Sequence, residues 1–206
     1  MQKLQHENYA RLREGSTILE KDSCGEKVLL LSDGTILKLF RRKHLISSAL
    51  LYPYAQRFAN NASVLQRLDI PCPVVIDTYR IPTIQRDAVH YQPLPGVSLR
   101  QIRLQEQNCP ADLFERLGQF TALLHHKGIY FRSIHLGNVI LTPEGELGLI
   151  DIADLQHQSR PLGRLKVERN FKHMLRDKDD SQWLSSKCRG DFWHAYQAAA
   201  NRLRGR

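Results

Sequence analysis

Two residues whose side chains supply oxygen ligands stand out in the middle of the chain, Asn138 and Asp151. Asn138 ends the polar segment YFRSIHLGN (130–138), and the apolar residues 139–141 follow it directly. Asp151 comes ten residues later, inside the apolar run LGLIDIADL (147–155). Amide and carboxylate oxygens are ligands that Mg²⁺ accepts, and two such residues on one hairpin suit the metal ions that accompany a nucleoside triphosphate. The pattern therefore predicts a metal site at this hairpin.

Asp151 is the stronger of these two signals. Leu149, Ile150 and Ile152 surround it, and an unpaired carboxylate within such a strand is costly. A metal ion or a cationic partner is therefore expected to compensate its charge. Asn138 by itself is more typical of an ordinary Gly-Asn turn than of a metal ligand.

The first part of the chain contains short β-strand patterns separated by turn residues. Asp33-Gly34 is a strong hairpin signal between two of them. The expected strands are STILEK (16–21), EKVLLL (26–31), TILKLF (35–40), PVVIDTYR (73–80) and DAVHYQ (87–92). Between the third and the fourth strand we expect a helix from about Ile46 to Leu68, interrupted at Pro53.

The second part of the chain reads as helical around a central loop. PLPGVSLRQI (93–102) has the two prolines and the glycine of a linker that precedes a helix. A longer helix is expected over 111–128, and the residues after 155 also have helical spacing. The chain is therefore predicted to be α+β with two lobes, a small β-rich N-lobe over 1–92 and a short helical C-lobe over 93–206.

This order of elements resembles the protein-kinase-like superfamily. RSIHLGNVIL (132–141) is similar to the catalytic loop of its small-molecule kinases, where a typical version reads GDLHPGNVL. YQPLPGVSLRQI (91–102) is similar to their hinge. More closely, the chain looks like the small bacterial lipopolysaccharide core kinases and toluene-tolerance proteins. The resemblance covers roughly residues 16–155.

The resemblance implies a two-lobed kinase-like fold and ATP- and Mg²⁺-dependent phosphoryl transfer to a lipopolysaccharide core sugar or a related envelope saccharide. It also implies roles for single residues. Lys38 and Gly25 would bind the nucleotide, Asn138 and Asp151 would bind metal, and Arg132, Ser133 and His135 would form the catalytic loop. A strand lysine also commonly snorkels to solvent, and a loop histidine commonly bonds backbone, so these alternatives stay open.

Several departures from the kinase pattern keep a second function open. Ser133 replaces the aspartate that would accept the substrate proton, and a serine hydroxyl is a poor base. His135, Asp154 or the substrate itself would have to supply that base. Asn60 or Asn61 stands where an acid should pair with the strand lysine. The alternative is a pseudokinase-type binding or regulatory module that responds to nucleotide and is linked to envelope or solvent stress.

The net charge of +9 is compatible with solvated basic faces or with attraction to an anionic substrate or membrane surface. Nucleic acid is a weaker expectation, because the basic clusters lack interleaved aromatic residues. A basic protein that binds nucleic acid or anionic lipid without nucleotide is the third hypothesis. The four cysteines lie far apart, which favours reduced thiols in a cytoplasmic protein. The basic charge is compatible with peripheral contact of that protein with the inner membrane.

Overall fold

The computed structural model describes residues 1–42, 52–105, 109–186 and 189–205. Its contacts fall into two compact units. The first comprises Met1–Gln66 and Cys72–Leu94, and the second comprises Arg67–Pro71 and Pro95–Arg206. Each unit is described by itself below.

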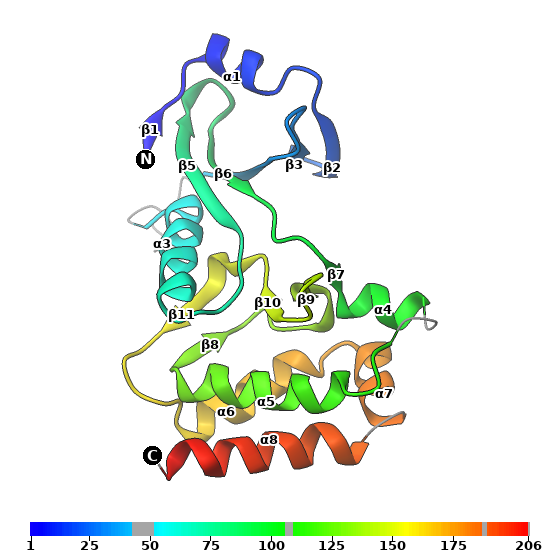
Figure 1. Ribbon diagram of the computed structural model, residues 1–206. Coiled ribbons are helices and arrows are strands. Elements are labelled where there is room, and N and C mark those ends of the chain that lie inside the picture. Colours follow the sequence, from blue (N-terminus) through cyan, green and yellow to red (C-terminus); the bar gives the residue numbers. More distant parts are fainter. Residues whose placement is uncertain (43–51, 106–108, 187–188, 206) are drawn as a thin grey trace. The chain divides into compact units, whose positions relative to one another are not determined.

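The first unit is built on a six-stranded sheet with the strand order β1-β5-β6-β4-β3-β2 (Figure 1). Only β1 and β5 pair in parallel; the other neighbours are antiparallel. The strands are β1 (Gln2–Lys3), β2 (Thr17–Asp22), β3 (Gly25–Leu30), β4 (Ile36–Arg41), β5 (Val74–Ile81) and β6 (Arg86–Gln92). The helices are α1 (His6–Leu12), a short 3-10 turn at Pro82–Ile84, and α3 (Tyr54–Arg67).

The strands of this unit confirm the five predicted from alternation and turn residues. Leu29, Leu37 and Ile81 are fully buried in the core of the sheet. The sequence did not predict α1, which is mostly polar but packs Tyr9 into the same core. Helix α3 begins directly after Pro53, and the predicted helical residues 46–51 lie outside the described part of the chain.

The second unit is mainly helical and carries two small sheets, β10-β9-β7 and β11-β8. Its strands are β7 (Val97–Ser98), β8 (Ile129–Phe131), β9 (Val139–Leu141), β10 (Leu147–Leu149) and β11 (Leu155–His157). Its helices are α4 (Leu99–Gln105), α5 (Leu113–His126), α6 (Arg164–Met174), α7 (Lys178–Ser186) and α8 (Arg189–Arg204). Short 3-10 turns lie at Leu136–Asn138 and Ile152–Asp154.

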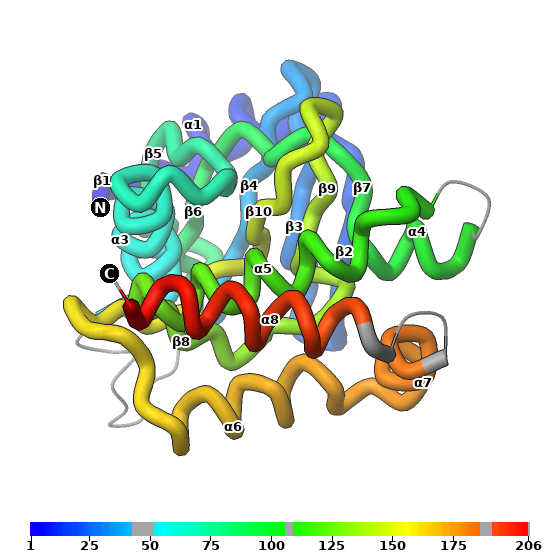
Figure 2. The backbone as a smooth tube through the Cα atoms, turned by 60° about the horizontal axis from the view of Figure 1, so that its bottom comes forward, coloured from blue at the N-terminus to red at the C-terminus, as the bar shows by residue number. Residues whose placement is uncertain are grey.

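Helices α5 and α8 run side by side in both views (Figures 1 and 2). Gly118 permits their close approach, because a Cβ atom at this position would lie 2.3 Å from the backbone oxygen of Phe192. The predicted helix over 111–128 is confirmed, with both ends shortened by two residues to Leu113–His126. The apolar face of α5 buries Leu113, Leu117 and Leu124.

The segment Arg67–Pro71 belongs to the second unit although it directly follows the residues of α3 in the first. Lys127 Nζ donates to the carbonyl oxygen of Leu68 at 2.8 Å. The backbone nitrogen of Leu149 donates to the carbonyl oxygen of Pro71 at 2.9 Å. These two hydrogen bonds fix the segment against α5 and β10.

The architecture confirms the predicted α+β class, with a β-rich N-terminal part and a helical C-terminal part, and it is compatible with the two-lobed kinase-like plan. Across the described residues, no helix combines the length and the apolar character that spanning a bilayer requires. Cys24, Cys72 and Cys109 are free thiols. Burial raises the pKa of the Cys72 thiol to about 11, so this side chain stays protonated at neutral pH.

Candidate functional site

The two small sheets of the second unit bring the predicted loop and its acids together. In the first, Val139 on β9 is opposite Leu149 on β10, so Asn138 and Ile150 meet just beyond the paired strands. In the second, Phe131 on β8 is opposite Leu155 on β11, so the residues after β8 face those before β11. The register of the two sheets therefore brings residues 150–154 next to the loop of residues 132–138, although the two segments are far apart in sequence.

Asn138 is buried and tied into the loop at three points. Its side-chain Nδ2 donates to the carbonyl oxygen of Ser133 at 2.9 Å. Its backbone nitrogen donates to the carbonyl oxygen of His135 at 2.9 Å. The backbone nitrogen of Ile150 donates to the carbonyl oxygen of Asn138 at 3.1 Å. Because Nδ2 is used to close the loop, Oδ1 is the Asn138 atom that would bind a metal.

Asp151 does not lie inside a strand, and the expectation of a buried acid is wrong. Strand β10 ends at Leu149, and Asp151 is exposed in the left-handed region, with φ 53° and ψ 43°. Aspartate adopts this conformation more readily than most residues. The turn carries the carboxylate out of the apolar run, so no desolvation cost demands compensation. Its suitability as a metal ligand rests on exposure beside Asn138 instead.

A hydrogen bond between Ser133 and Asp154 is the feature that the sequence left undecided. Ser133 Oγ donates to Asp154 Oδ2 at 2.7 Å. The other oxygen, Oδ1, is buried and has no hydrogen-bond partner among the residues that the structure describes. Buried carboxylate oxygens usually have such a partner. A carboxylate with a spare acceptor atom therefore lies directly beside the loop position where Ser133 replaces an aspartate.

His135 orders the loop through its backbone. Its Nδ1 accepts a hydrogen bond from the backbone nitrogen of Gly137 at 3.1 Å, so the neutral ring carries its proton on Nε2. Burial, followed by the nearby guanidinium of Arg100, lowers the pKa of His135 below its usual value. The ring is therefore neutral near pH 7 and presents a donor at Nε2. Of the three sources of a base named from the sequence, this geometry favours Asp154 over His135.

Arg132 is exposed where the loop begins and lies in a positively charged environment. Tyr130, two residues earlier, places its hydroxyl 3.4 Å from His173 Nε2 on α6. Burial lowers the pKa of His173, the guanidinium groups of Arg132 and Arg176 lower it further, and the Asp154 carboxylate opposes this to a smaller extent. The start of the loop is therefore suited to an anionic group.

Helix α4 is fixed at its start and against α7, and its Arg100 lies beside the loop, 3.4 Å from where a Cβ atom at Gly137 would be. Ser98 and Gln101 form a reciprocal capping box at its start, in which the Ser98 backbone nitrogen donates to Gln101 Oε1 at 2.8 Å and the Gln101 backbone nitrogen donates to Ser98 Oγ at 3.2 Å. Arg100 then donates from Nε to Asp180 Oδ2 at 3.1 Å, and Asp180 is fully buried. Arg103 Nε lies 3.2 Å from Asp180 Oδ1, close enough for an ion pair but without hydrogen-bond geometry.

Lys38 and Gly25, the residues predicted to bind nucleotide, lie in the first unit. Lys38 is half-buried in the centre of β4, opposite Val28 and Val89, with Nζ 5.9 Å from the centroid of the Phe40 ring. Gly25 has φ 110° and starts β3 after a short turn. Asn60, which stands near the expected position of an acid, accepts a hydrogen bond from Gln56 on the same helix.

The oxygen ligands that the second unit offers suit Mg²⁺ better than they suit a metal that takes all its ligands from protein. The described residues contain no group of three or more His, Cys, Asp or Glu side chains arranged to hold an ion. Mg²⁺ typically takes one or two protein carboxylates and completes its shell with water and phosphate oxygens. Asn138 and Asp151 offer that limited set. The role of each predicted site residue stays a prediction.

The comparisons with known proteins concern the fold alone. No protein-family model and no curated protein matches the sequence. The structure is similar to WbdD in complex with the kinase inhibitor LY294002, with 15% sequence identity and a TM-score of 0.47 over 88% of this chain and 42% of that one. It is also similar to monomeric WbdD, with 14% identity and a TM-score of 0.47 over 88% of this chain and 43% of that one. The chain thus spans less than half the length of these structures.

Proposed function

We propose that the protein transfers the γ-phosphoryl group of Mg²⁺-bound ATP to a hydroxyl of a lipopolysaccharide core sugar or a related envelope saccharide. The observation that carries this proposal is the Ser133–Asp154 hydrogen bond of 2.7 Å, together with the buried and unpartnered Oδ1 of Asp154. The acid missing from the loop sequence is replaced in space by one from the turn before β11.

Asp154 is the group that would take the proton from the acceptor. As the acceptor oxygen forms its bond to the γ-phosphorus, the bond from that phosphorus to the nucleoside diphosphate breaks, and the hydroxyl proton passes to the Asp154 carboxylate. Ser133 orients that carboxylate by donating to Oδ2, which leaves Oδ1 as the acceptor. Ser133 therefore positions the base, although it cannot act as one.

Asn138 Oδ1 and the Asp151 carboxylate are the atoms that would hold Mg²⁺, which neutralises the charge of the transferred group when bound. The Ile150–Asn138 backbone hydrogen bond of 3.1 Å couples the turn that carries Asp151 to the loop that carries Asn138. Lys38 would bind the nucleotide phosphates, as the resemblance to kinases implies. Because phosphoryl transfer depends mainly on charge neutralisation and positioning, these groups matter as much as the base.

The acceptor class is proposed from two features. The similarity of RSIHLGNVIL (132–141) to the loops of lipopolysaccharide core kinases favours a saccharide hydroxyl. The guanidinium groups of Arg132 and Arg176, which both act on His173 near the start of the loop, favour an acceptor that already carries negative charge. Both features suit a phosphorylated or acidic core sugar.

The deciding experiment compares Asp154→Asn with the unaltered protein in two separate assays. Nucleotide binding is measured by calorimetry with Mg²⁺, and transfer is measured with radiolabelled ATP and acidic lipopolysaccharide core oligosaccharides, phosphorylated and dephosphorylated. Loss of a general base lowers the transfer rate by about 10²- to 10⁴-fold. We expect that loss in Asp154→Asn with binding retained, and a smaller loss in Ser133→Ala.

A different outcome would favour the regulatory alternative. If the unaltered protein binds Mg²⁺-nucleotide but transfers no phosphate to any saccharide tested, the protein is a nucleotide-responsive binding module. If Asp154→Asn transfers phosphate at the normal rate, Asp154 is not the base and the Ser133–Asp154 bond only stabilises the loop. A matched control is Glu144→Gln, an exposed acid in the β9–β10 turn that has no proposed role.

A further inference from the structure

Helix α6 has a solvent-facing side that the proposed phosphoryl transfer does not use. Its exposed residues are Arg164, Leu165, Glu168, Arg169 and Lys172, here called the outer face of α6. At 100° per residue these five positions cover one continuous side of the helix. Leu165 is 73% exposed, and its neighbours on the helix surface are Glu168 and Arg169. A large aliphatic side chain is thus displayed among charged ones.

The opposite side of α6 is firmly packed. Phe171 lies with its ring centroid 4.8 Å from that of Trp193 and 4.9 Å from that of Tyr196, both on α8. Asn170 is buried; its Oδ1 accepts a hydrogen bond from His125 Nε2 at 2.9 Å, and its Nδ2 donates to the carbonyl oxygen of Phe131 at 2.6 Å. Substitutions on the outer face should therefore leave the helix in place.

The charge around this face is strongly positive. From His157 to Arg176, both included, the sequence has six lysine and arginine residues and one acid, Glu168. That acid is paired with Arg164, whose Nε lies 2.9 Å from Glu168 Oε1. Beyond the C-terminal end of α6, Asp177 and Asp180 pair with Arg100. Each acid named here is thus paired with an arginine, which leaves the outer face with an excess of positive charge.

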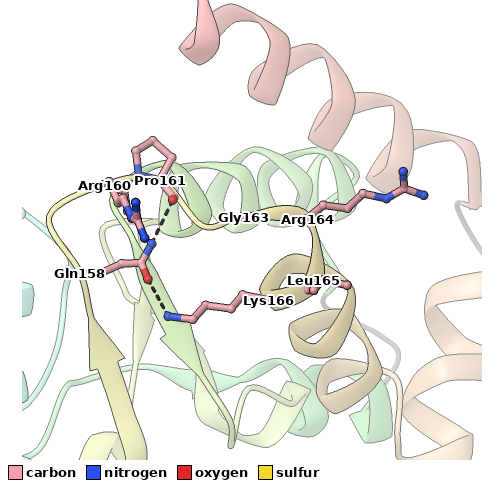
Figure 3. Close-up of a pocket in the computed structure, with 7 residues that line it drawn as sticks. All are labelled: Gln158, Arg160, Pro161, Gly163, Arg164, Leu165 and Lys166. Carbon is pink, nitrogen blue, oxygen red and sulfur yellow. Dashed lines mark hydrogen bonds between the residues drawn. The ribbon is translucent and has the colours of Figure 1, made fainter.

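A recess of about 540 Å³ at the N-terminal end of α6 extends the basic region. It is lined by Gln158, Arg160, Pro161, Gly163, Arg164, Leu165 and Lys166. Lys166 Nζ donates to Gln158 Oε1 at 2.6 Å across it, while Arg164 points away from Gln158 (Figure 3). Arg160 therefore continues the basic character of the outer face onto the loop before the helix.

We propose that the outer face of α6, with Arg160, docks on the surface of a bilayer that contains anionic phospholipids. Leu165 would enter the boundary between headgroups and acyl chains, and Arg160, Arg169 and Lys172 would contact lipid phosphates. The exposed positions of the face are aliphatic or charged, so they offer no ring on which a nucleic-acid base would stack. An aliphatic centre with a basic surround is the arrangement that matches a lipid surface.

Docking in this way would also serve the proposed site. Helix α6 packs against β8 through Tyr130 and His173, and β8 leads directly into the loop that begins at Arg132. A bilayer against α6 would thus hold the loop of the same unit near acceptors anchored in the membrane. The docking itself requires no nucleotide and no catalysis, so its test is independent of the proposed function.

Vesicle flotation tests this proposal without nucleotide. The full-length protein is mixed with large vesicles of phosphatidylcholine alone or of phosphatidylcholine with phosphatidylglycerol, at low and at moderate salt. We expect partition onto the anionic vesicles only. The double variant Arg169→Gln/Lys172→Gln should lower the partition coefficient about 25-fold, since each lost basic residue near the surface weakens binding about fivefold.

Two further variants separate docking of this face from general attraction by net charge. Leu165→Asn leaves the charge unchanged and should weaken vesicle binding about tenfold. Arg11→Gln/Lys21→Gln removes two exposed basic residues of the first unit and should leave binding nearly unchanged. Equal losses in both double variants, or no loss in Leu165→Asn, would overturn the proposal. Duplex DNA is then added at the same total charge as the anionic lipid. If it displaces the protein completely from the vesicles, the face is instead a nucleic-acid-binding surface. Circular dichroism of each variant verifies that the fold is retained.

Discussion

The two units differ in how they hold the residues that the sequence singled out. In the first unit, Lys38 is in the middle of β4 and Gly25 follows a surface turn, and each is held by its own strand. In the second unit, Ser133, Asn138 and Asp154 form one chain of hydrogen bonds that spans the loop and the turn before β11. Preorganisation of this kind is what phosphoryl transfer requires. The chemistry is therefore expected to depend more on the second unit.

The two units also differ in how many arginine side chains contact a buried aspartate. Asp180 in the second unit is fully buried and contacts Arg100 and Arg103. Asp87 in the first unit is also buried but pairs with a single arginine, Arg80, whose side chain is 39% exposed. Removing one member of a buried charge group leaves its partners uncompensated, whereas an exposed partner regains water. The two units thus offer a matched comparison.

The largest effect on stability is expected from Asp180→Ala. It removes the buried carboxylate that Arg100 and Arg103 share and leaves them only the exposed carboxylates of Asp177 and Asp179, so the free energy of unfolding should fall by about 3 kcal/mol. Asp87→Ala should cost about 1 kcal/mol, because it leaves a single guanidinium, that of Arg80, which is partly exposed. Urea titrations followed by circular dichroism measure both values. Equal losses in the two variants would show that the second unit is not braced more firmly than the first.

Nucleotide binding should depend on Asp151 and on Lys38 in different ways. ATP with Mg²⁺ at about a hundred times its dissociation constant should raise the free energy of unfolding by about 2.7 kcal/mol. Asp151→Asn should remove the part of this stabilisation that requires Mg²⁺. Lys38→Met should reduce nucleotide binding with or without the metal. Thermal unfolding with ATP, Mg²⁺ or both measures these shifts, with Glu144→Gln as the control. An unchanged Mg²⁺-dependent shift in Asp151→Asn would eliminate the proposed metal site.

A buried histidine in each unit should make stability fall in mild acid. Burial lowers the pKa of His125 and of His90 in the folded state. Because the unfolded side chains take up protons near pH 6.5, stability is fully present above that pH and is lost as the pH falls below it, by up to about 1.4 kcal/mol per pH unit for each histidine. Asp33 and Asp77 oppose the lowering at His90.

His125→Gln should therefore flatten the dependence of stability on pH between 6.5 and 5 more than His90→Gln does. Glutamine keeps a hydrogen-bonding side chain beside Asn170 and Tyr196, which contact His125 at 2.9 Å each. Urea midpoints measured across this pH range give the comparison. A steeper dependence in His125→Gln than in the unaltered protein would contradict the pKa direction.

The smallest effect is expected at the start of α4. Ser98→Ala removes the hydroxyl of the capping box with Gln101 and should cost about 1 kcal/mol. Ser63→Ala on α3 is the control, because the Ser63 hydroxyl is exposed and bonds only its own helix backbone at 3.1 Å. Its effect should stay within about 0.5 kcal/mol. A control as destabilised as Ser98→Ala would remove the case for a specific cap.

The elements that position the site were largely predictable from the sequence. Alternating apolar residues and Asp33-Gly34 specified the β3–β4 hairpin, and the apolar spacing over 111–128 specified α5. Helix α1 was missed because its pattern is mostly polar, and only the sheet beneath Tyr9 provides its apolar partner. Asp151 was expected inside a strand because LGLIDI is apolar, but the left-handed turn at this residue depends on the chain beyond it.

By itself the sequence determined where five strands of the first unit, the helix α5 and the polar loop lie, and it located Asn138 and Asp151 at the ends of one hairpin. These are properties of short segments, set by the spacing of apolar residues and by turn chemistry. Only the tertiary structure decided which acid accompanies Ser133. The choice of Asp154 follows from the register of β8 against β11, which pairs Phe131 with Leu155. A register across so many residues is set by packing, because it depends on which faces of both strands are buried together.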